Sequence, residues 1–202
     1  MKTDIILSGV GGQGILSIAT IIGEAATRMG LTLKQAEVHG MSQRGGDVQS
    51  NLRLSDEPIA SDLIALGTAD MIISLEPMEA LRYLPYLSQD GWIITSSAPF
   101  KNIPNYPDEQ ALADELKALP HVVSLDVEGL AKENQIPRSA NVILLGAAAG
   151  FLQILDAKTL RESVGRIFAS KGEEVVEMNY RAFDIGYDYV KNRTVECQQR
   201  DI

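Results

Sequence analysis

The chain has 202 residues, of which 45% are hydrophobic and 22% charged, and its formal net charge is −9. This composition is typical of a globular protein, and the length suits one α/β unit. General nucleic-acid binders and binders of anionic membranes need a broad basic surface, so we expect neither kind of partner. The single cysteine, Cys197, cannot by itself hold an iron–sulfur cluster, a structural zinc ion or an internal disulfide.

No segment of the sequence predicts a membrane span or a targeting signal. The most apolar run, from Val142 to Leu152, is too short to cross a bilayer and is typical of a buried helix. The first residues lead directly into a predicted strand, so we expect no signal peptide. We therefore expect a cytoplasmic protein that has no metal site of its own.

A glycine-rich stretch near the start, residues 4–16, predicts a phosphate-binding turn. It consists of a short apolar strand at residues 5–7, a turn, and the beginning of an amphipathic helix. Glycines at the G-x-G-x-x-G spacing let the backbone approach an anion, which the free N–H groups of the helix then attract. The candidate binding residues are Gly9, Gly11, Gly12, Gln13 and Gly14. The alternative is a tight strand-to-helix turn that binds no ligand.

The next two elements follow the order of a dinucleotide-binding unit. Apolar residues at helical spacing predict a helix over 15–29, ended by Gly30, and then a strand over 31–38. Glu37 lies near the end of that strand, where an acidic residue would hold a ribose 2′-hydroxyl. A solvent-facing strand residue is an equally good interpretation of Glu37.

A second polar loop, residues 39–46, follows this strand directly. The carboxyl ends of parallel strands meet at one edge of a sheet, so we expect this loop to face the glycine turn. Its candidate binding residues are Ser42, Gln43, Arg44 and Gly45. Arg44 is the natural partner of a phosphate, because its guanidinium can donate to two oxygens at once. His39 is interpreted as a hydrogen-bonding residue rather than an acid or base.

The remaining elements complete an α/β pattern. Expected strands cover residues 48–54, 71–75, 92–95 and 122–127, and expected helices cover 77–87, 108–119, 141–155, 156–168 and 173–192. The strand over 48–54 alternates, which predicts a half-buried strand near a sheet edge, and Asp90-Gly91 predicts a turn. The order predicts a Rossmann-like three-layer α/β/α fold with a mostly parallel sheet and a helical C-terminal part. We expect one domain over residues 1–192 and a polar tail over 193–202.

No catalytic group stands out in the sequence. The two histidines, His39 and His121, are far apart, there is no Gly-x-Ser-x-Gly elbow, and no set of metal ligands is grouped. An anion-binding site without its own catalytic residues is what we expect of a subunit of a larger enzyme.

The two glycine loops together resemble those of a known family. Gly9-Val-Gly-Gly-Gln-Gly14 with Glu37-Val-His-Gly-Met-Ser-Gln-Arg-Gly-Gly46 is similar to the gamma-type subunit of 2-oxoacid:ferredoxin oxidoreductases, particularly the indolepyruvate type. The segment Ser74–Leu81 and Asn179 with Ala182-Phe183 are also similar, so the resemblance covers nearly the whole chain.

The resemblance implies a role and partners. Such enzymes decarboxylate a 2-oxoacid on thiamine diphosphate, pass electrons through iron–sulfur clusters to ferredoxin, and release an acyl-coenzyme A. In the indolepyruvate type a large alpha subunit carries thiamine diphosphate and the clusters. The gamma-type chain would then bind coenzyme A, with residues 11–14 facing its phosphates and Ser42, Gln43 and Arg44 completing the pocket. These residues would position the coenzyme and neutralise its charge, and none would make or break a bond.

Two other functions are compatible with the sequence. The first is a stand-alone Rossmann-type dinucleotide-binding protein with Glu37 on the ribose, which would bind NAD but not coenzyme A. The second is a scaffold protein whose glycine loop has lost its ligand. Titration with NAD and coenzyme A separates them.

Overall fold

The computed structural model describes residues 1–39, 45–101 and 103–200, with the backbone alone at residue 39 and at residues 193–200. Its strands are β1 (Lys2–Val10), β2 (Thr32–His39), β3 (Asp47–Ser55), β4 (Ala69–Ser74), β5 (Leu87–Ser96) and β6 (Val122–Leu125). Its α-helices are α1 (Ile15–Arg28), α2 (Pro77–Arg82), α3 (Glu109–Ala118), α4 (Val127–Glu133), α5 (Ala140–Ala149), α6 (Ala157–Phe168) and α7 (Glu173–Arg200). Two short 3₁₀ helices, Leu84–Tyr86 and Ala169–Lys171, follow α2 and α6.

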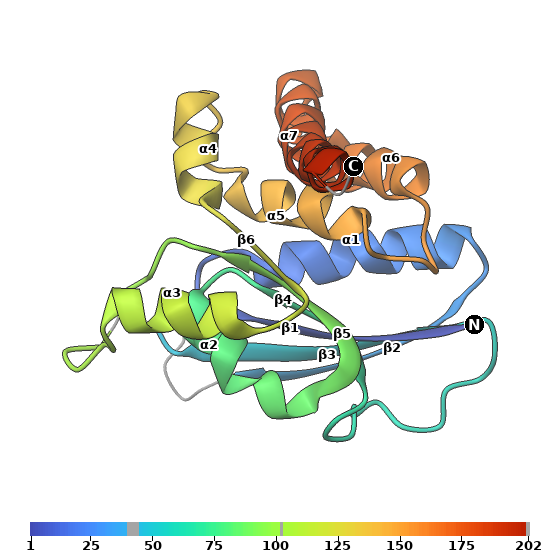
Figure 1. Ribbon diagram of the computed structural model, residues 1–202. Helices are drawn as coiled ribbons and strands as arrows, with labels where there is room; N and C mark the ends of the chain where they lie inside the picture. Colours follow the sequence, from blue (N-terminus) through green and yellow to red (C-terminus); the bar gives the residue numbers. More distant parts are fainter. Residues whose placement is uncertain (40–44, 102, 201–202) are drawn as a thin grey trace.

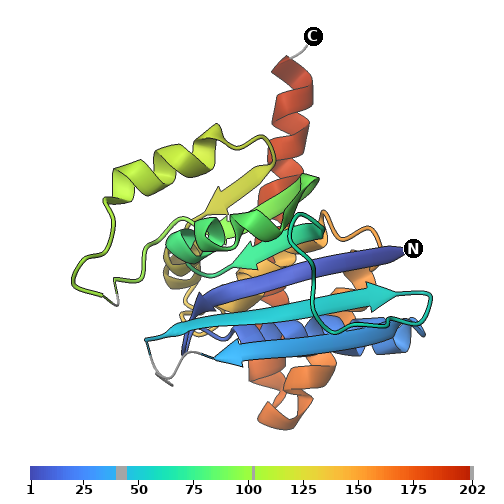
Figure 2. The ribbon, with the colours of Figure 1, turned by 90° about the horizontal axis from the view of Figure 1, so that it is seen from below.

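The strands form one mixed sheet in the order β2-β3-β1-β4-β5-β6. β1, β4, β5 and β6 are parallel neighbours, whereas β3 runs antiparallel to both β1 and β2. Figure 2 shows β3 running opposite to the strands on either side of it. Five of the six strands therefore point the same way, and their carboxyl ends share one edge of the sheet.

Helices cover both faces of the sheet, as the sequence predicts. α1 and α5 pack on one face, and α2 and α3 pack on the other. α4, α6 and α7 lie outside α1 and α5, which makes that side the thicker one (Figure 1). The α/β/α prediction is confirmed.

The main core lies between the sheet and α1 with α5. Ile5 and Leu7 of β1 point into it, while Ile6 points to the smaller core under α2 and α3. The apolar run predicted to be a buried helix forms α5, whose residues after Asn141 are all buried. No helix in the described ranges is long and apolar enough to cross a membrane.

The strand β3 is buried, not half-buried as its alternation predicts. It lies between β1 and the edge strand β2, so the expectation of a place near the edge is correct. Two of its polar residues, Asn51 and Arg53, bond to the segment over residues 56–68; the Ile64 N–H donates to Asn51 Oδ1 at 3.1 Å. Hydrogen bonds with this segment therefore satisfy part of the polar face of the strand.

Several element boundaries differ from the prediction. β5 runs through Asp90 and Gly91, which lie in the strand and do not form a turn. Its register with β4 shifts here, and a Cβ at Gly91 would lie 2.9 Å from the Ala69 carbonyl, so this position suits glycine. α2 ends at Arg82, ahead of Pro85, which lies in the 3₁₀ turn. The expected strand over 122–127 ends at Leu125 and is followed by the unexpected helix α4.

Two further helical predictions, those over 141–155 and 173–192, also need correction. α5 ends at Ala149 rather than at residue 155, with Gly150 as its C-cap. α7 continues to Arg200, so the segment predicted to be a polar tail is helical through that residue. Residues 193–200 contain neither glycine nor proline, so nothing in the backbone stops the helix at residue 192.

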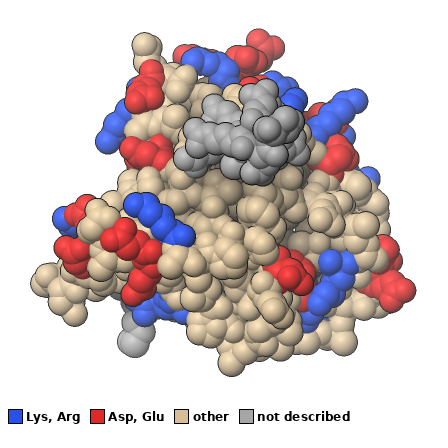
Figure 3. Space-filling view, in the orientation of Figure 1, with Lys and Arg blue, Asp and Glu red and all other residues tan. Residues whose placement is uncertain are grey.

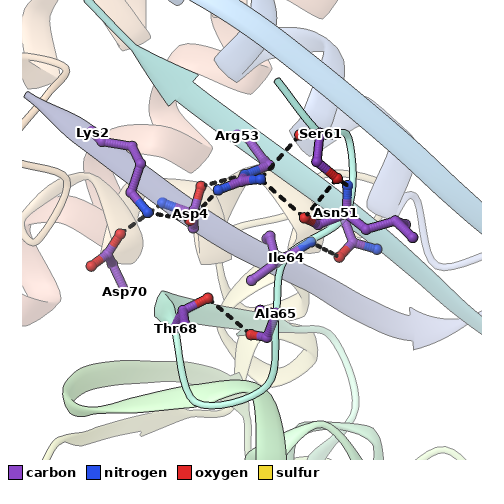
Figure 4. A network of polar contacts seen from close by, with 10 residues as sticks. Lys2, Asp4, Asn51, Arg53, Ser61, Ile64, Ala65, Thr68 and Asp70 are labelled. Atoms are coloured by element: carbon purple, nitrogen blue, oxygen red, sulfur yellow. Dashed lines mark hydrogen bonds and ion pairs between the residues drawn. The ribbon is translucent and has the colours of Figure 1, made fainter. Parts of the chain in front are cut away.

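A buried carboxylate, Asp4, links β1 to β3 near the amino end of β1, at the opposite end of that strand from the glycine turn. Asp4 is fully buried and receives two hydrogen bonds from Arg53, at 2.8 and 2.9 Å, and one from Lys2 at 2.6 Å (Figure 4). Arg53 also donates to the carbonyls of Ser61 and Leu63, both at 3.0 Å. Burial by itself would raise the pKa of Asp4, but the hydrogen bonds from Arg53 and Lys2 lower it below its usual value.

We expect Asp4→Asn to lower the free energy of unfolding by about 1–2 kcal/mol at pH 7, because charge-assisted hydrogen bonds are lost. The lowered pKa in the folded state means that Asp4 stabilises the protein above the pKa of the unfolded chain. That contribution is lost as the pH falls through the folded-state pKa. Urea unfolding of both proteins between pH 7 and pH 2 is the measurement. A difference that stays constant over this range would contradict the assignment.

Candidate functional site

The carboxyl edge of the sheet brings the two glycine loops together. The glycine turn follows β1, and the loop between β2 and β3 ends beside it. The Gly11 N–H donates to the Gly46 carbonyl at 2.8 Å, and the Gly45 N–H donates to the Gly11 carbonyl at 3.5 Å. The end of the second loop therefore lies against the glycine turn, although an antiparallel strand separates their parent strands. Whether the rest of that loop faces the same crevice concerns residues 40–44, which lie outside the described residues.

The start of α1 presents unpaired backbone donors. Within the described part of the chain, no acceptor is bonded to the N–H groups of Gly12, Gly14, Ile15 and Leu16. The first intrahelical bond is donated by Ser17, to the Gly14 carbonyl at 3.1 Å. No side chain caps this helix. Free N–H groups at a helix start attract an anion, so the turn has the chemistry of a phosphate site.

Three of the five predicted residues of the turn act on the protein itself. A Cβ at Gly9 would lie 3.0 Å from Gln13 Oε1 and 3.1 Å from Ile15, so Gly9 permits close strand–helix packing. Gly14 has φ +90°, and a Cβ there would meet Asn141 Nδ2 at 2.7 Å. The Gln13 side chain accepts from the Val10 N–H at 2.7 Å and donates to the Leu75 carbonyl at 3.0 Å. Gln13 therefore holds the turn, with both ends of its amide in use.

Gly12 is the residue of the turn most open to a ligand. It is exposed, has φ +104°, and a Cβ added to it would find no atom within 4 Å. Its backbone therefore has the open approach that a bound phosphate needs. Any other residue at this φ is strained, so a side chain at Gly12 affects the fold as well as the site.

A depression of about 470 Å³ lies beside the turn and contains an arginine. Gly11, Gly12 and Gln13 line it on one side. The other lining residues are Phe100, Glu128, Pro137, Arg138, Ala140 and Asn141. Arg138 is exposed and forms no hydrogen bond or ion pair with the described residues, so its guanidinium is available to an anion. Glu128, from α4, is an acidic residue of the same lining.

Asn141 joins this depression to the glycine turn. Its Nδ2 donates to the Gly14 carbonyl at 3.2 Å, and its Oδ1 accepts from the Val142 N–H at 3.0 Å. The helix expected over 141–155 begins slightly earlier, since Ser139 occupies the N-cap position of α5 and Asn141 lies in its first turn. The amide thus links the start of α5 to the start of α1, and it brings Arg138 to the phosphate-type loop.

The other predicted site residues have different outcomes. Ser42, Gln43 and Arg44 lie outside the described residues, as does the side chain of His39. Gly45 lies next to Gly11, with φ +77°. Glu37 is exposed on β2 and accepts from Gln35 Nε2 at 2.6 Å. Because β3 separates β2 from β1, Glu37 lies two strand spacings, about 10 Å, to the side of β1. This does not favour the ribose-binding role.

Other parts of the molecule offer less to an anion. A larger hollow of about 620 Å³ lies between α3 and β6, and its lining is mostly aliphatic, with Lys117 as its basic group. Among the described residues no three His, Cys, Asp or Glu side chains are grouped to hold a metal ion. Acidic and basic side chains are interspersed around the periphery of the face in Figure 3, whose middle is largely uncharged.

Comparison with known proteins decides the family. The model of the pyruvate ferredoxin/flavodoxin oxidoreductase family matches residues 4–189, which is most of the chain. The chain belongs to this family. The resemblance seen in the two glycine loops is thereby confirmed, and the chain is a subunit of a 2-oxoacid:ferredoxin oxidoreductase.

Relatives of this chain in other organisms match it over most of its length. The indolepyruvate oxidoreductase subunit IorB of Archaeoglobus fulgidus is 34% identical over 198 residues, covering 93% of this chain and 95% of the relative. The subunit IorB of Thermococcus kodakarensis is 36% identical over 202 residues, covering 93% and 96%. The 2-oxoglutarate synthase subunit KorC of Methanocaldococcus jannaschii is 26% identical and covers 95% of each chain.

Solved structures of this family share the fold. The gamma subunit of a keto/oxoacid ferredoxin oxidoreductase from Geobacter sulfurreducens has a TM-score of 0.73 at 22% identity, covering 95% of this chain and 98% of that chain. The 2-oxoglutarate:ferredoxin oxidoreductase of Magnetococcus marinus, solved with 2-oxoglutarate, coenzyme A and succinyl-coenzyme A, also gives 0.73 at 24% identity. The present chain corresponds to 31% of that longer chain.

The sequence prediction of the site missed Arg138 and the role of Asn141. In the sequence, Pro137 indicates only a break between helical segments. A signal was nevertheless present, since Arg138 immediately precedes an apolar helix, and residues before a helix start lie where anions bind. What the sequence does not show is that the starts of α5 and α1 adjoin.

Proposed function

We propose that this chain is the subunit of an indolepyruvate or aryl-pyruvate:ferredoxin oxidoreductase that binds the phosphates of coenzyme A. The observation that carries the proposal is the set of free N–H groups at Gly12, Gly14, Ile15 and Leu16 beside the unpaired guanidinium of Arg138. Backbone donors and a forked cation suit a diphosphate. The names of the 34–36% identical relatives support the indolepyruvate substrate.

The chain's own contribution is to bind and orient. Coenzyme A supplies the thiol that takes up the acyl group, and the phosphate site would hold the far end of that molecule. Arg138 and the start of α1 would neutralise the phosphates, while Gln13 and Asn141 keep the two helix starts in place. Ser42, Gln43 and Arg44 remain predicted members of this pocket. Fixing the coenzyme lowers the entropic cost of bringing its thiol to the reacting carbon.

The decarboxylation itself belongs to a partner in this proposal. The partner is a large subunit with thiamine diphosphate and iron–sulfur clusters, and ferredoxin accepts the electrons. Purification of the chain from its native cytosol, with iron and thiamine analysis of what accompanies it, tests this. A cysteine-rich partner carrying both is the expected result. A chain that purifies alone and oxidises a 2-oxoacid would overturn the proposal.

Gly12→Ser should weaken coenzyme A binding by roughly five- to tenfold, because the new side chain occupies the open approach to the turn. A larger residue such as valine is a poor test, since φ +104° strains any substituent and β-branched residues most. Gly172→Ser is the matched control, because Gly172 has φ +97° and equally open surroundings far from the site. Both variants should lose similar stability, and equal coenzyme affinities in the two would remove Gly12 from the site.

A further inference from the structure

A buried carboxylate beside the site has no assigned role so far. Glu76, at the carboxyl end of β4, is fully buried, and no basic side chain among the described residues contacts it. Its Oε2 accepts from the Glu79 N–H at 2.9 Å, which caps α2. Its Oε1 accepts from the Tyr106 hydroxyl and from the Phe100 N–H, the latter at 3.3 Å. A buried carboxylate needs such donors to offset its lost hydration.

These bonds hold the segment between β5 and α3 at two points. Phe100 and Tyr106 both belong to it, and both are attached to the same oxygen of Glu76. Burial first, and then the bond to Glu76, raise the pKa of Tyr106, so its hydroxyl remains a donor at neutral pH. Pro99 lines the larger hollow, whereas Phe100 lines the depression beside the glycine turn. Through Phe100, the segment between β5 and α3 thus forms part of the wall of the depression beside the glycine turn.

Phe100 is an aromatic ring exposed in a polar setting. Its side chain is 45% exposed, although a phenylalanine is ordinarily buried. It shares its depression with Gly12 and Arg138, the groups that suit phosphates. A ligand that joins phosphates to a flat base would meet both kinds of surface at once, because bases stack on aromatic side chains.

We propose that Phe100 is the stacking surface for the adenine base of the bound coenzyme, and that Glu76 is the positioning residue that holds Phe100 there through its own N–H and through Tyr106. The proposal rests on the proposed function, since it assigns the base within the same site. Phe100 would contribute to the affinity for the nucleotide part of coenzyme A and not to the affinity for its pantetheine arm.

The test compares ligand fragments on the assembled oxidoreductase. Isothermal titration gives the affinities of coenzyme A, adenosine 3′,5′-bisphosphate and phosphopantetheine. Phe100→Ala should weaken the first two by about tenfold and leave phosphopantetheine within about twofold. Phe100→Trp should preserve all three affinities. Ile103→Ala is the matched control, because Ile103 is an exposed apolar residue of the same segment outside the lining, and it should change nothing.

Tyr106→Phe tests the positioning role, because Glu76 keeps its hydrogen bonds from the Phe100 and Glu79 N–H groups in this variant. It removes one donor to Glu76 and should weaken adenosine 3′,5′-bisphosphate by about threefold, whereas in a Phe100→Ala background it should have no further effect. Additive losses would mean that Tyr106 and Glu76 merely stabilise the fold, and would overturn their role. Glu76→Gln, if it folds, should behave like Tyr106→Phe.

The outcomes separate the two proposals. Equal losses for all three fragments on Phe100→Ala, or no loss for any, would overturn the stacking role. If Gly12→Ser and Arg138→Ala still weaken coenzyme A in that case, the phosphate site stands and only this inference fails. If the wild-type complex binds neither coenzyme A nor adenosine 3′,5′-bisphosphate, the proposed function and this inference fail together.

Discussion

Gly186→Ala is expected to lower the free energy of unfolding by about 3–5 kcal/mol, the largest stability effect that we predict. A Cβ at Gly186 on α7 would lie 1.9 Å from the Ile143 carbonyl of α5. The reverse contact is equally close, since a Cβ at Gly146 on α5 would lie 2.0 Å from the Phe183 carbonyl. Backbone atoms cannot move aside by changing rotamer, so the two helices would have to separate.

Gly150→Ala is the matched control for this prediction. Gly150 has right-handed helical dihedrals, and a Cβ there would approach no atom closer than 3.7 Å. Its replacement should be neutral or should stabilise the protein by up to about 1 kcal/mol, through the unfolded state. Urea unfolding of both variants is the measurement. Similar stabilities for Gly186→Ala and Gly150→Ala would contradict the close packing of α5 on α7.

Arg138→Ala is expected to weaken coenzyme A binding by roughly 10- to 100-fold, the largest functional effect that we predict. The reason is the loss of a charge-assisted contact from a guanidinium that no described residue engages. Because Arg138 is exposed, the effect should shrink as salt is added. The measurement is titration of the assembled complex with coenzyme A at low and high ionic strength.

The control for Arg138 is a second surface arginine. Arg166 is 64% exposed and pairs with Glu24 at 3.0 Å on α1, away from the depression. Arg166→Ala removes the same charge from the protein, so it corrects for any general effect of net charge. An affinity for coenzyme A that is equal in the two variants would exclude Arg138 from the site.

The sequence predicts the elements of this fold well where local signals are strong. The N-caps Asp108 and Asp156 begin helices as expected, and each accepts a backbone hydrogen bond three residues on. The helix expected from residue 173 is present as α7; its Asn179 and Phe183 are buried, and Asn179 donates to the Val175 carbonyl within its own helix. These features depend on neighbours within about one helical turn, so the sequence pattern suffices.

The local sequence pattern does not predict the order of the strands in the sheet. Nothing in the alternation over residues 48–54 shows that β3 inserts between β1 and β2, or that residues 56–68 form hydrogen bonds with its polar face. The order is determined by contacts between segments far apart in the chain, such as Asn51 with Ile64 and Asp4 with Arg53. The prediction of a turn at Asp90-Gly91 is wrong for the same reason, since both residues lie in β5, whose pairing with β4 is not visible in the local pattern.

The candidate site shows the same division. The glycine turn and its unpaired N–H groups could be predicted, because the glycine spacing stands between an apolar strand and an amphipathic helix. The internal roles of Gly9, Gln13 and Gly14 required the structure, since each depends on what packs against the turn. Arg138 and Phe100 reach the site from opposite ends of the β5–α5 region, and no local pattern indicates that they meet there.

The most direct test of the central claim is titration of the assembled wild-type complex with coenzyme A and with NAD. We predict saturable binding of coenzyme A that is weakened by Gly12→Ser and by Arg138→Ala, and no binding of NAD. Binding of NAD without coenzyme A, or coenzyme A binding that neither variant weakens, would contradict the assignment of the glycine turn and Arg138 to the coenzyme site.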